Sequence, residues 1–129
     1  MTQLARLMCL VCLMPVGAMA GDFDGSKILL CAPSEGRECV SGEACTSERP
    51  ADVGVPAFFR VDAAKKTIMG HKLSTPILHV EKDDRELLLE GTEVETGWTI
   101  AIDLADGTMV LTLAERDWVG VLFGACTPL

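Results

Sequence analysis

Three cysteines fall within the fifteen-residue segment CAPSEGRECVSGEAC, and a fourth lies near the C-terminus. They are Cys31, Cys39, Cys45 and Cys126. Clustered cysteines can hold zinc, react as thiolates or form disulfides. Zinc sites use closely spaced ligands, whereas seven and five residues separate the first three cysteines and no histidine lies near them. The spacing therefore predicts two disulfides and no metal site.

A hairpin turn at Ser41-Gly42-Glu43 would decide which cysteines form disulfides with each other. A three-residue turn there places Cys39 opposite Cys45, and opposed Cβ atoms in an antiparallel pair lie about 4.5–5.5 Å apart, close to disulfide range. Of the three connectivities that four cysteines allow, this favours Cys39–Cys45 together with Cys31–Cys126. The second bond would join the two ends of the chain.

The residues that usually carry catalysis are sparse. The chain has two histidines, His71 and His79, and contains neither a G-x-S-x-G nor an H-E-x-x-H motif. His79 alternates with Leu78 and Val80, so it should face solvent, and His71 follows Gly70 in a connection. Both are interpreted as surface residues. We therefore expect a protein that is not an enzyme.

Acidic residues gather at two expected turns. The groups are Glu90, Glu93 and Glu95, and Asp103 and Asp106. Paired carboxylates can transfer protons or bind calcium, but neither group has the spacing of a calcium loop. The segment 22–25 (DFDG) matches only a fragment of such a loop. We interpret these residues as solvated, and expect no metal and no cofactor. An enzyme that uses the three glutamates is the alternative.

Two tryptophans are the main aromatic residues, and tyrosine is absent. In a barrel, Trp98 and Trp118 could line a ligand cavity, although in a domain of this size aromatic side chains more often fill the core. Both interpretations stay open from the sequence.

The first twenty residues, MTQLARLMCLVCLMPVGAMA, have the form of a secretory signal peptide. Arg6 precedes a short apolar run that ends in Ala18-Met19-Ala20, so cleavage is expected after Ala20. An uncleaved N-terminal anchor is the alternative. Cys9 and Cys12 fall inside this peptide without the neighbours of a lipoprotein signal, so no lipid anchor is expected. The prediction is a periplasmic or secreted bacterial protein.

Residues 21–129 are expected to form one domain of acidic character. They carry 10 Lys and Arg against 19 Asp and Glu, because Arg6 is the only charge before them. An acidic surface repels nucleic acid and anionic membranes, so neither is expected as a partner.

Apolar residues in this part of the chain alternate with a period of two, which is typical of strands. The expected strands lie at 27–32, 58–62, 67–69, 77–82, 86–91, 98–104, 108–113 and 118–123. The clearest hairpin has its turn at Ala105-Asp106-Gly107, and the last run is apolar on both faces, as in a central or closing strand. The pattern predicts an all-β antiparallel meander of about six to nine short strands that forms a small barrel, or alternatively a sandwich.

Several short motifs resemble those of a set of small exported proteobacterial proteins with no assigned function. The motifs are Leu30-Cys31-Ala32, Cys39, Cys45, Phe59-Arg60-Val61-Asp62, Gly91, Gly97-Trp98-Thr99, Ile102-Asp103, Gly107 and Val121-Leu122-Phe123-Gly124-Ala125-Cys126-Thr127. The resemblance spans most of residues 21–129. It implies export and a common β fold, and it assigns no catalytic or binding residue.

The chain also resembles, more loosely, the periplasmic inhibitors of C-type lysozyme, which are small disulfide-bonded antiparallel barrels. An acidic inhibitor would complement a basic lysozyme. Those inhibitors carry a Ser-Gly motif with nearby tyrosines, and this chain has no tyrosine. The likeness concerns architecture, and architecture does not fix function.

The sequence thus favours a non-enzymatic binding or interaction protein with an unidentified protein or small-ligand partner. A carrier of a small apolar ligand, with its pocket near Trp98, is the alternative. An inhibitor of a cationic enzyme such as lysozyme is a third hypothesis.

Overall fold

The computed structural model describes residues 21–129. The expected signal peptide, residues 1–20 with its cleavage site and two cysteines, lies outside the described residues. Within residues 21–129, no helix is long and apolar enough to cross a membrane.

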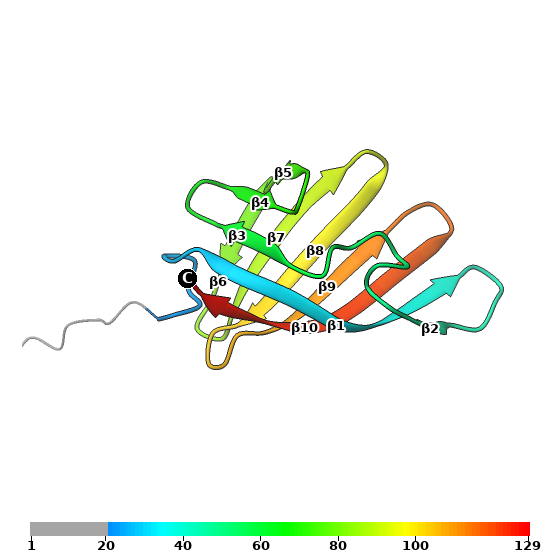
Figure 1. Cartoon of the computed structure of the whole chain (residues 1–129), viewed down its shortest axis with the longest axis horizontal. Helices are drawn as coiled ribbons and strands as arrows, with labels where there is room; N and C mark the ends of the chain where they lie inside the picture. The colour runs from blue at the N-terminus through cyan, green and yellow to red at the C-terminus, as the bar shows by residue number, and fades with distance from the viewer. Residues whose placement is uncertain (1–20) are drawn as a thin grey trace, which may run out of the picture.

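Ten strands form a single antiparallel sheet (Figure 1). They are β1 (Leu29–Val40), β2 (Thr46–Glu48), β3 (Phe59–Asp62), β4 (Thr67–Met69), β5 (Ser74–Pro76), β6 (His79–Lys82), β7 (Glu86–Glu93), β8 (Thr96–Asp103), β9 (Thr108–Ala114) and β10 (Trp118–Pro128). Their order is β5-β4-β3-β1-β10-β9-β8-β7-β6, and β2 pairs with β1 beside this path. The all-β antiparallel prediction is confirmed, with ten strands where six to nine were expected.

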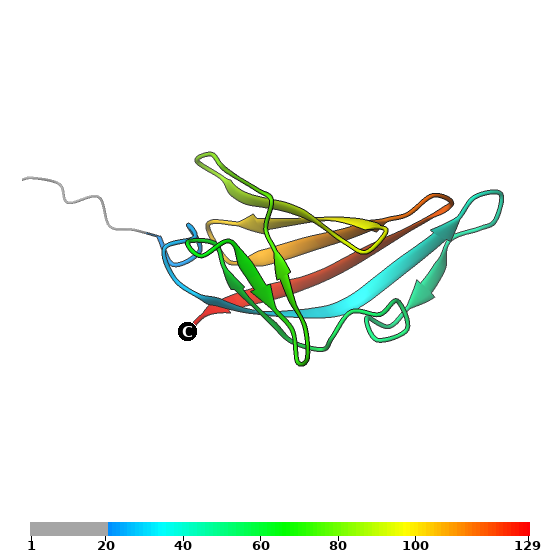
Figure 2. The same cartoon turned by 90° about the horizontal axis from the view of Figure 1, so that it is seen from above.

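The sheet curls into a half-barrel, as the two perpendicular views show (Figures 1 and 2). Its two edge strands, β5 and β6, are joined by only Ile77 and Leu78. The Ile77 amide donates to the Lys66 carbonyl at 2.9 Å, and the Leu78 amide donates to the Glu90 carbonyl at 2.9 Å. The connection is therefore bonded to both sides of the opening. The barrel expectation holds in this half-closed form, and the structure is one curled sheet and not the alternative sandwich.

The long antiparallel pair of β1 and β10 lies at the centre of the sheet. Its register shifts between Pro33 and Glu35, and the Ser34 hydroxyl donates to the Phe123 carbonyl at 3.2 Å beside this irregularity. The second half of β1 was not predicted from the sequence, because residues 34–38 are mostly polar and do not alternate with apolar residues. Pairing with β10 on one side and β2 on the other extends the strand.

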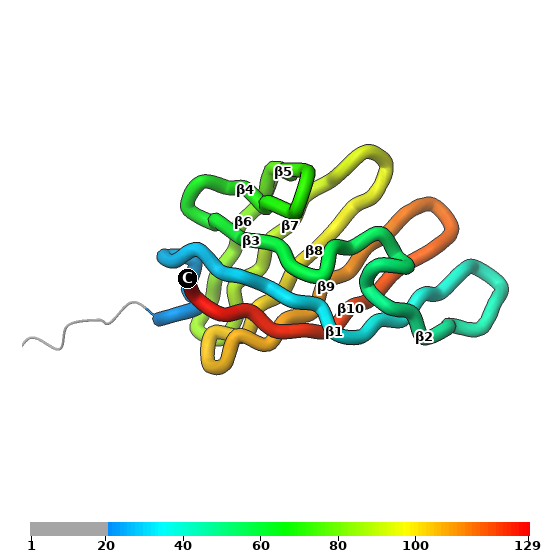
Figure 3. Tube along the Cα trace, viewed as in Figure 1, coloured from blue at the N-terminus to red at the C-terminus, as the bar shows by residue number. Residues whose placement is uncertain are grey.

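Both disulfides have the pairing expected from the sequence. Cys31 and Cys126 are register partners on β1 and β10, and their side chains are buried in the core. Cys39 and Cys45 close the turn between β1 and β2 and are more exposed. Figure 3 shows that the C-terminus lies beside the start of β1, where the Leu129 amide donates to the Ile28 carbonyl. One bond therefore fastens the sheet centre, and the other fastens a hairpin tip.

Replacing Cys31 and Cys126 by alanine should lower the free energy of unfolding by about 2–5 kcal/mol, because this bond spans 95 residues and constrains the unfolded chain strongly. Replacing Cys39 and Cys45, which are six residues apart, should cost less. Urea denaturation of both double variants measures the difference. An equal or larger loss from the Cys39/Cys45 pair would contradict this assignment.

A candidate ligand cavity at the open end of the half-barrel

The inside of the half-barrel is ordered in transverse rows, because directly paired residues of β7, β8, β9 and β10 share a face. The innermost row consists of Leu87, Ile102, Met109 and Gly124. The next row consists of Leu89, Ile100, Leu111 and Leu122. A third row consists of Gly91, Trp98, Leu113 and Gly120. The periodicity that predicted these strands also predicted most of the inward positions.

The end of the half-barrel next to the innermost row is filled. Leu87, Ile102 and Met109 are buried there, at no more than 2% exposure. Phe23, from the segment before β1, packs across the turn between β8 and β9, where a Cβ at Gly107 would lie 2.3 Å from Phe23 Cε1. Gly107 has a φ of 76°, so the turn also needs the left-handed conformation that glycine adopts easily. The inside of the half-barrel is therefore filled at this end.

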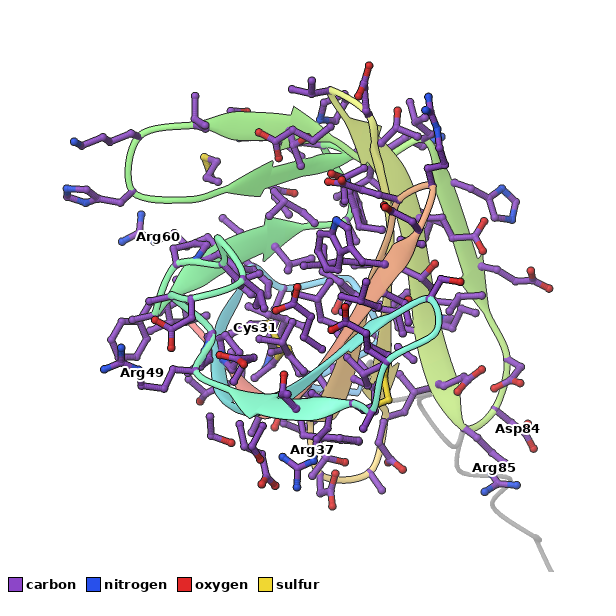
Figure 4. The ribbon with its side chains drawn as sticks, turned by 90° about the vertical axis from the view of Figure 1, so that its right-hand side faces the viewer. Cys31, Arg37, Arg49, Arg60, Asp84 and Arg85 are labelled. Carbon is purple, nitrogen blue, oxygen red and sulfur yellow. A yellow bond between two sulfur atoms is a disulfide. The ribbon has the colours of Figure 1, made fainter. Side chains whose placement is uncertain are left out.

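The opposite end holds a cavity of about 680 Å³. Its walls are largely apolar side chains from one loop and five strands. They are Val53, Val55, Phe59, Ile68, Trp98, Ile100, Leu111, Leu113 and Trp118. Figure 4 looks toward this end and shows Cys31 among the side chains inside, whereas Arg37, Arg49 and Arg85 point away from the centre. The half-barrel is thus packed at one end and hollow at the other.

Three hairpin turns and one loop surround the cavity mouth. The turns connect β4 with β5, β7 with β8, and β9 with β10, and the loop spans residues 51–56. Val94 and Leu73 lie at the mouth and are 97% and 70% exposed. Val94 also has a φ of 54°, an unfavourable conformation for a β-branched residue that costs about 1–2 kcal/mol. Such strain recurs at binding sites, where the surroundings hold it in place.

Trp98 forms part of the cavity wall and depends on a glycine across the sheet. Its indole lies over Gly91, the residue paired with it on β7, so closely that a Cβ at Gly91 would lie 2.2 Å from Trp98 Cζ2. The ring is 7% exposed, and its Nε1 is buried without a hydrogen-bond partner among the described residues. A buried indole N–H normally has an acceptor, so this donor is an unusual feature of the cavity wall.

Trp118 and Glu115 form a polar cluster at the mouth. The Glu115 carboxylate accepts a hydrogen bond from the Thr96 hydroxyl at 2.6 Å. The Thr96 hydroxyl and then the Trp118 indole lower the pKa of Glu115 below its ordinary value, since both stabilise the charged carboxylate. The Trp118 ring lies over Gly120 of its own strand, so closely that a Cβ at Gly120 would lie 2.9 Å from Trp118 Cζ3. The cluster therefore places a fixed negative charge beside an aromatic wall.

Some of the residues singled out from the sequence line the cavity, and others lie away from it. Both tryptophans line the same cavity, and His71 and Glu93 lie at its mouth. His79 is exposed and faces Glu81, with 3.6 Å between Nε2 and Oε2. Glu90 and Glu95 do not line the cavity. Of the two histidines interpreted as surface residues, both are exposed, and one belongs to the candidate site.

The aspartates at the turn between β8 and β9 have a structural role. The Asp103 carboxylate accepts from the Ala105 amide at 2.7 Å. The Asp106 carboxylate accepts from the Thr108 amide at 2.9 Å, and this bond lowers the pKa of Asp106. Across residues 21–129, no group of three or more His, Cys, Asp or Glu side chains is arranged to hold a metal ion.

Periodicity did not reveal the loop at residues 51–56 as part of the site. Its sequence, ADVGVP, carries two valines without strand alternation, and Val55 is buried. Apolar residues in a loop bounded by prolines were the available signal. Their role becomes visible only when the loop is seen against the inner face of the sheet.

No protein-family model, no curated protein and no solved structure matches this chain. The resemblances to exported proteobacterial proteins and to lysozyme inhibitors stay predictions from the sequence.

Gly91→Ala should displace the Trp98 indole and destabilise the protein by about 1–3 kcal/mol, the usual cost of overpacking. Gly97→Ala is the matched control, because its Cβ would meet no atom closer than the Ala114 carbonyl oxygen at 3.8 Å. Urea denaturation and tryptophan emission of both variants test this. Equal stability of the two variants would show that Trp98 does not rest on Gly91.

Thr96→Val should raise the pKa of Glu115 toward its ordinary value of 4.5, because the largest cause of its lowering is lost. The folded-state pKa of Glu115 is depressed, so its contribution to stability is present above the ordinary value and is lost as the pH falls through the folded-state pKa. Carbon-13 NMR titration of the Glu115 carboxyl measures the shift. Thr99→Val, on the same strand, is the control. An unchanged midpoint in Thr96→Val would contradict the hydrogen bond.

Proposed function

We propose that the protein is a non-enzymatic binding protein that holds a small, largely apolar ligand inside the half-barrel. The cavity carries this proposal. At about 680 Å³ it falls within the usual size of small-molecule sites, about 300–1,000 Å³. Its wall combines tryptophan and aliphatic side chains, and burial of apolar ligand surface against them would drive binding. Curled sheets of about eight strands have room for one such ligand.

The chemistry of the lining residues supports binding in preference to catalysis. The titratable side chains at the cavity are His71, Lys72, Glu93 and Glu115. All four are exposed at the mouth, and the deeper wall is apolar apart from Thr75 and the Trp98 N–H. Glu115 is hydrogen-bonded to a threonine and a tryptophan, which keeps it ionised. Among the described residues, the hydroxyl in contact with one of these groups is that of Thr96, and the lowered pKa of Glu115 makes this carboxylate a weak base.

We place this function in the periplasm or outside a bacterial cell. The form of residues 1–20 predicts export, and two disulfides suit an oxidising compartment.

A second candidate is recognition of a cationic protein through the tip of the β7–β8 hairpin. Val94 projects there at 97% exposure between Glu93 and Glu95. An apolar tip flanked by carboxylates would suit insertion into the cleft of a basic enzyme, as an inhibitor of lysozyme requires. Inhibition of a C-type lysozyme that is lost in Val94→Gly would favour this candidate over the carrier.

The carrier is tested with N-phenyl-1-naphthylamine, an uncharged apolar fluorophore whose emission rises in apolar surroundings. The wild-type protein should bind one molecule with micromolar affinity, about −8 kcal/mol. Leu113→Trp, which fills the cavity wall, should abolish binding. Thr112→Trp is the matched control, because it places the same ring on the outer face of the same strand.

Binding that is lost in Leu113→Trp and kept in Thr112→Trp would locate the ligand in the cavity. Absence of binding to the wild-type protein, or equal binding to both variants, would contradict the proposed function. Circular dichroism of each variant confirms that the sheet is intact.

A further inference from the structure

A fourth transverse row lies at the mouth of the cavity, and it is polar. It consists of Glu93, Thr96, Glu115 and Trp118, one residue from each of β7, β8, the β9–β10 turn and β10. Glu93 and Thr96 are register partners. Thr96 donates to Glu115, and the Glu115 amide donates to the Trp118 carbonyl at 3.0 Å. Two carboxylates therefore lie in one row with an aromatic ring, directly above the apolar rows.

The charges at the mouth are unevenly placed. Both carboxylates belong to this row, whereas His71 and Lys72 come from the β4–β5 turn. Glu115 is held in position by its bond to Thr96, whereas neither Lys72 nor Glu93 has a side-chain hydrogen bond or ion pair in the described part of the chain. A fixed carboxylate loses less conformational freedom on binding than a free lysine side chain.

An ammonium group is the ligand chemistry that suits such a row. Carboxylates attract a cation, and the face of a tryptophan adds a cation–π interaction, which is strongest with this ring type. Trp118 is partly exposed in the cavity, next to Glu115. An anionic head group would meet two like charges at the same place. The excess of acidic residues in the whole chain adds to the same preference.

We propose that the cavity selects cationic amphiphiles, with the hydrocarbon chain against Trp98, Ile100 and Leu111 and the ammonium group at Glu93, Glu115 and Trp118. This inference rests on the proposed function and adds the chemical class of the ligand. A primary amine and a quaternary ammonium share the required charge. The quaternary group gains more from the aromatic face and less from hydrogen bonding.

Three compounds with the same ten-carbon chain provide the test: decyltrimethylammonium, decanol and decanoate. Each compound is titrated against bound N-phenyl-1-naphthylamine, at concentrations below micelle formation, and displacement of the probe is measured. Decyltrimethylammonium should displace it at a concentration about tenfold lower than decanol, and decanoate should be the weakest. Raising the salt concentration should reduce the preference for the cation, because the mouth is open to solvent.

The double variant Glu93→Gln/Glu115→Gln should bring the cation and the alcohol to within about threefold of each other. Glu95→Gln is the matched control. It removes one charge from the same hairpin turn at a residue that does not line the cavity, and it should keep the preference.

The outcomes separate the two proposals. Equal displacement by the cation and the alcohol would overturn the cationic preference and leave the apolar cavity standing. Strongest displacement by decanoate would also overturn it, and would assign the head group to Lys72 and His71. A probe that does not bind the wild-type protein at all would refute the proposed function itself.

Discussion

The fold depends on the pairing of β1 with β10. This pair joins two parts of the sheet at its centre: β3, β4 and β5 on one side, and β9, β8, β7 and β6 on the other. Away from this pair, the two parts meet at the short connection between β5 and β6. The Cys31–Cys126 bond crosses this seam inside the core. Since the strands on the two sides must curl toward each other to enclose the apolar rows, the seam also sets the position of the cavity walls.

The sequence predicted the parts of the fold that are governed by local alternation. The hairpin of β8 and β9 followed from inward Trp98 and Ile100 and from the turn at Gly107. It did not predict the second half of β1, because residues 33–40 begin with a proline and do not alternate between polar and apolar side chains. Those residues become a strand only through neighbours that are distant in the sequence, β10 above all. Stabilisation by distant neighbouring strands leaves no periodic pattern in the sequence of the strand itself.

The candidate site was only partly predictable for the same reason. Trp98 and Trp118 could be named from their residue type, with core and cavity as open alternatives. The structure brings both to one cavity, but it does so through Gly91 and Gly120, which leave space for the two rings. The row of Glu93, Thr96 and Glu115 joins two separate turns. From the sequence, Glu93 was grouped with Glu90 and Glu95, and Thr96 and Glu115 were not named. The three form one row only through strand register.

The side chains inside the half-barrel thus change along its axis from aliphatic to aromatic to acidic. The open end, where the aromatic and acidic rows lie, is the basis for proposing a binding function. Intermolecular NOE spectroscopy with decanol tests this claim most directly. Cross-peaks from the decyl chain to the Trp98 indole and the Leu111 methyl groups would support it. Cross-peaks confined to outer residues such as Phe123 and Val119 would contradict it.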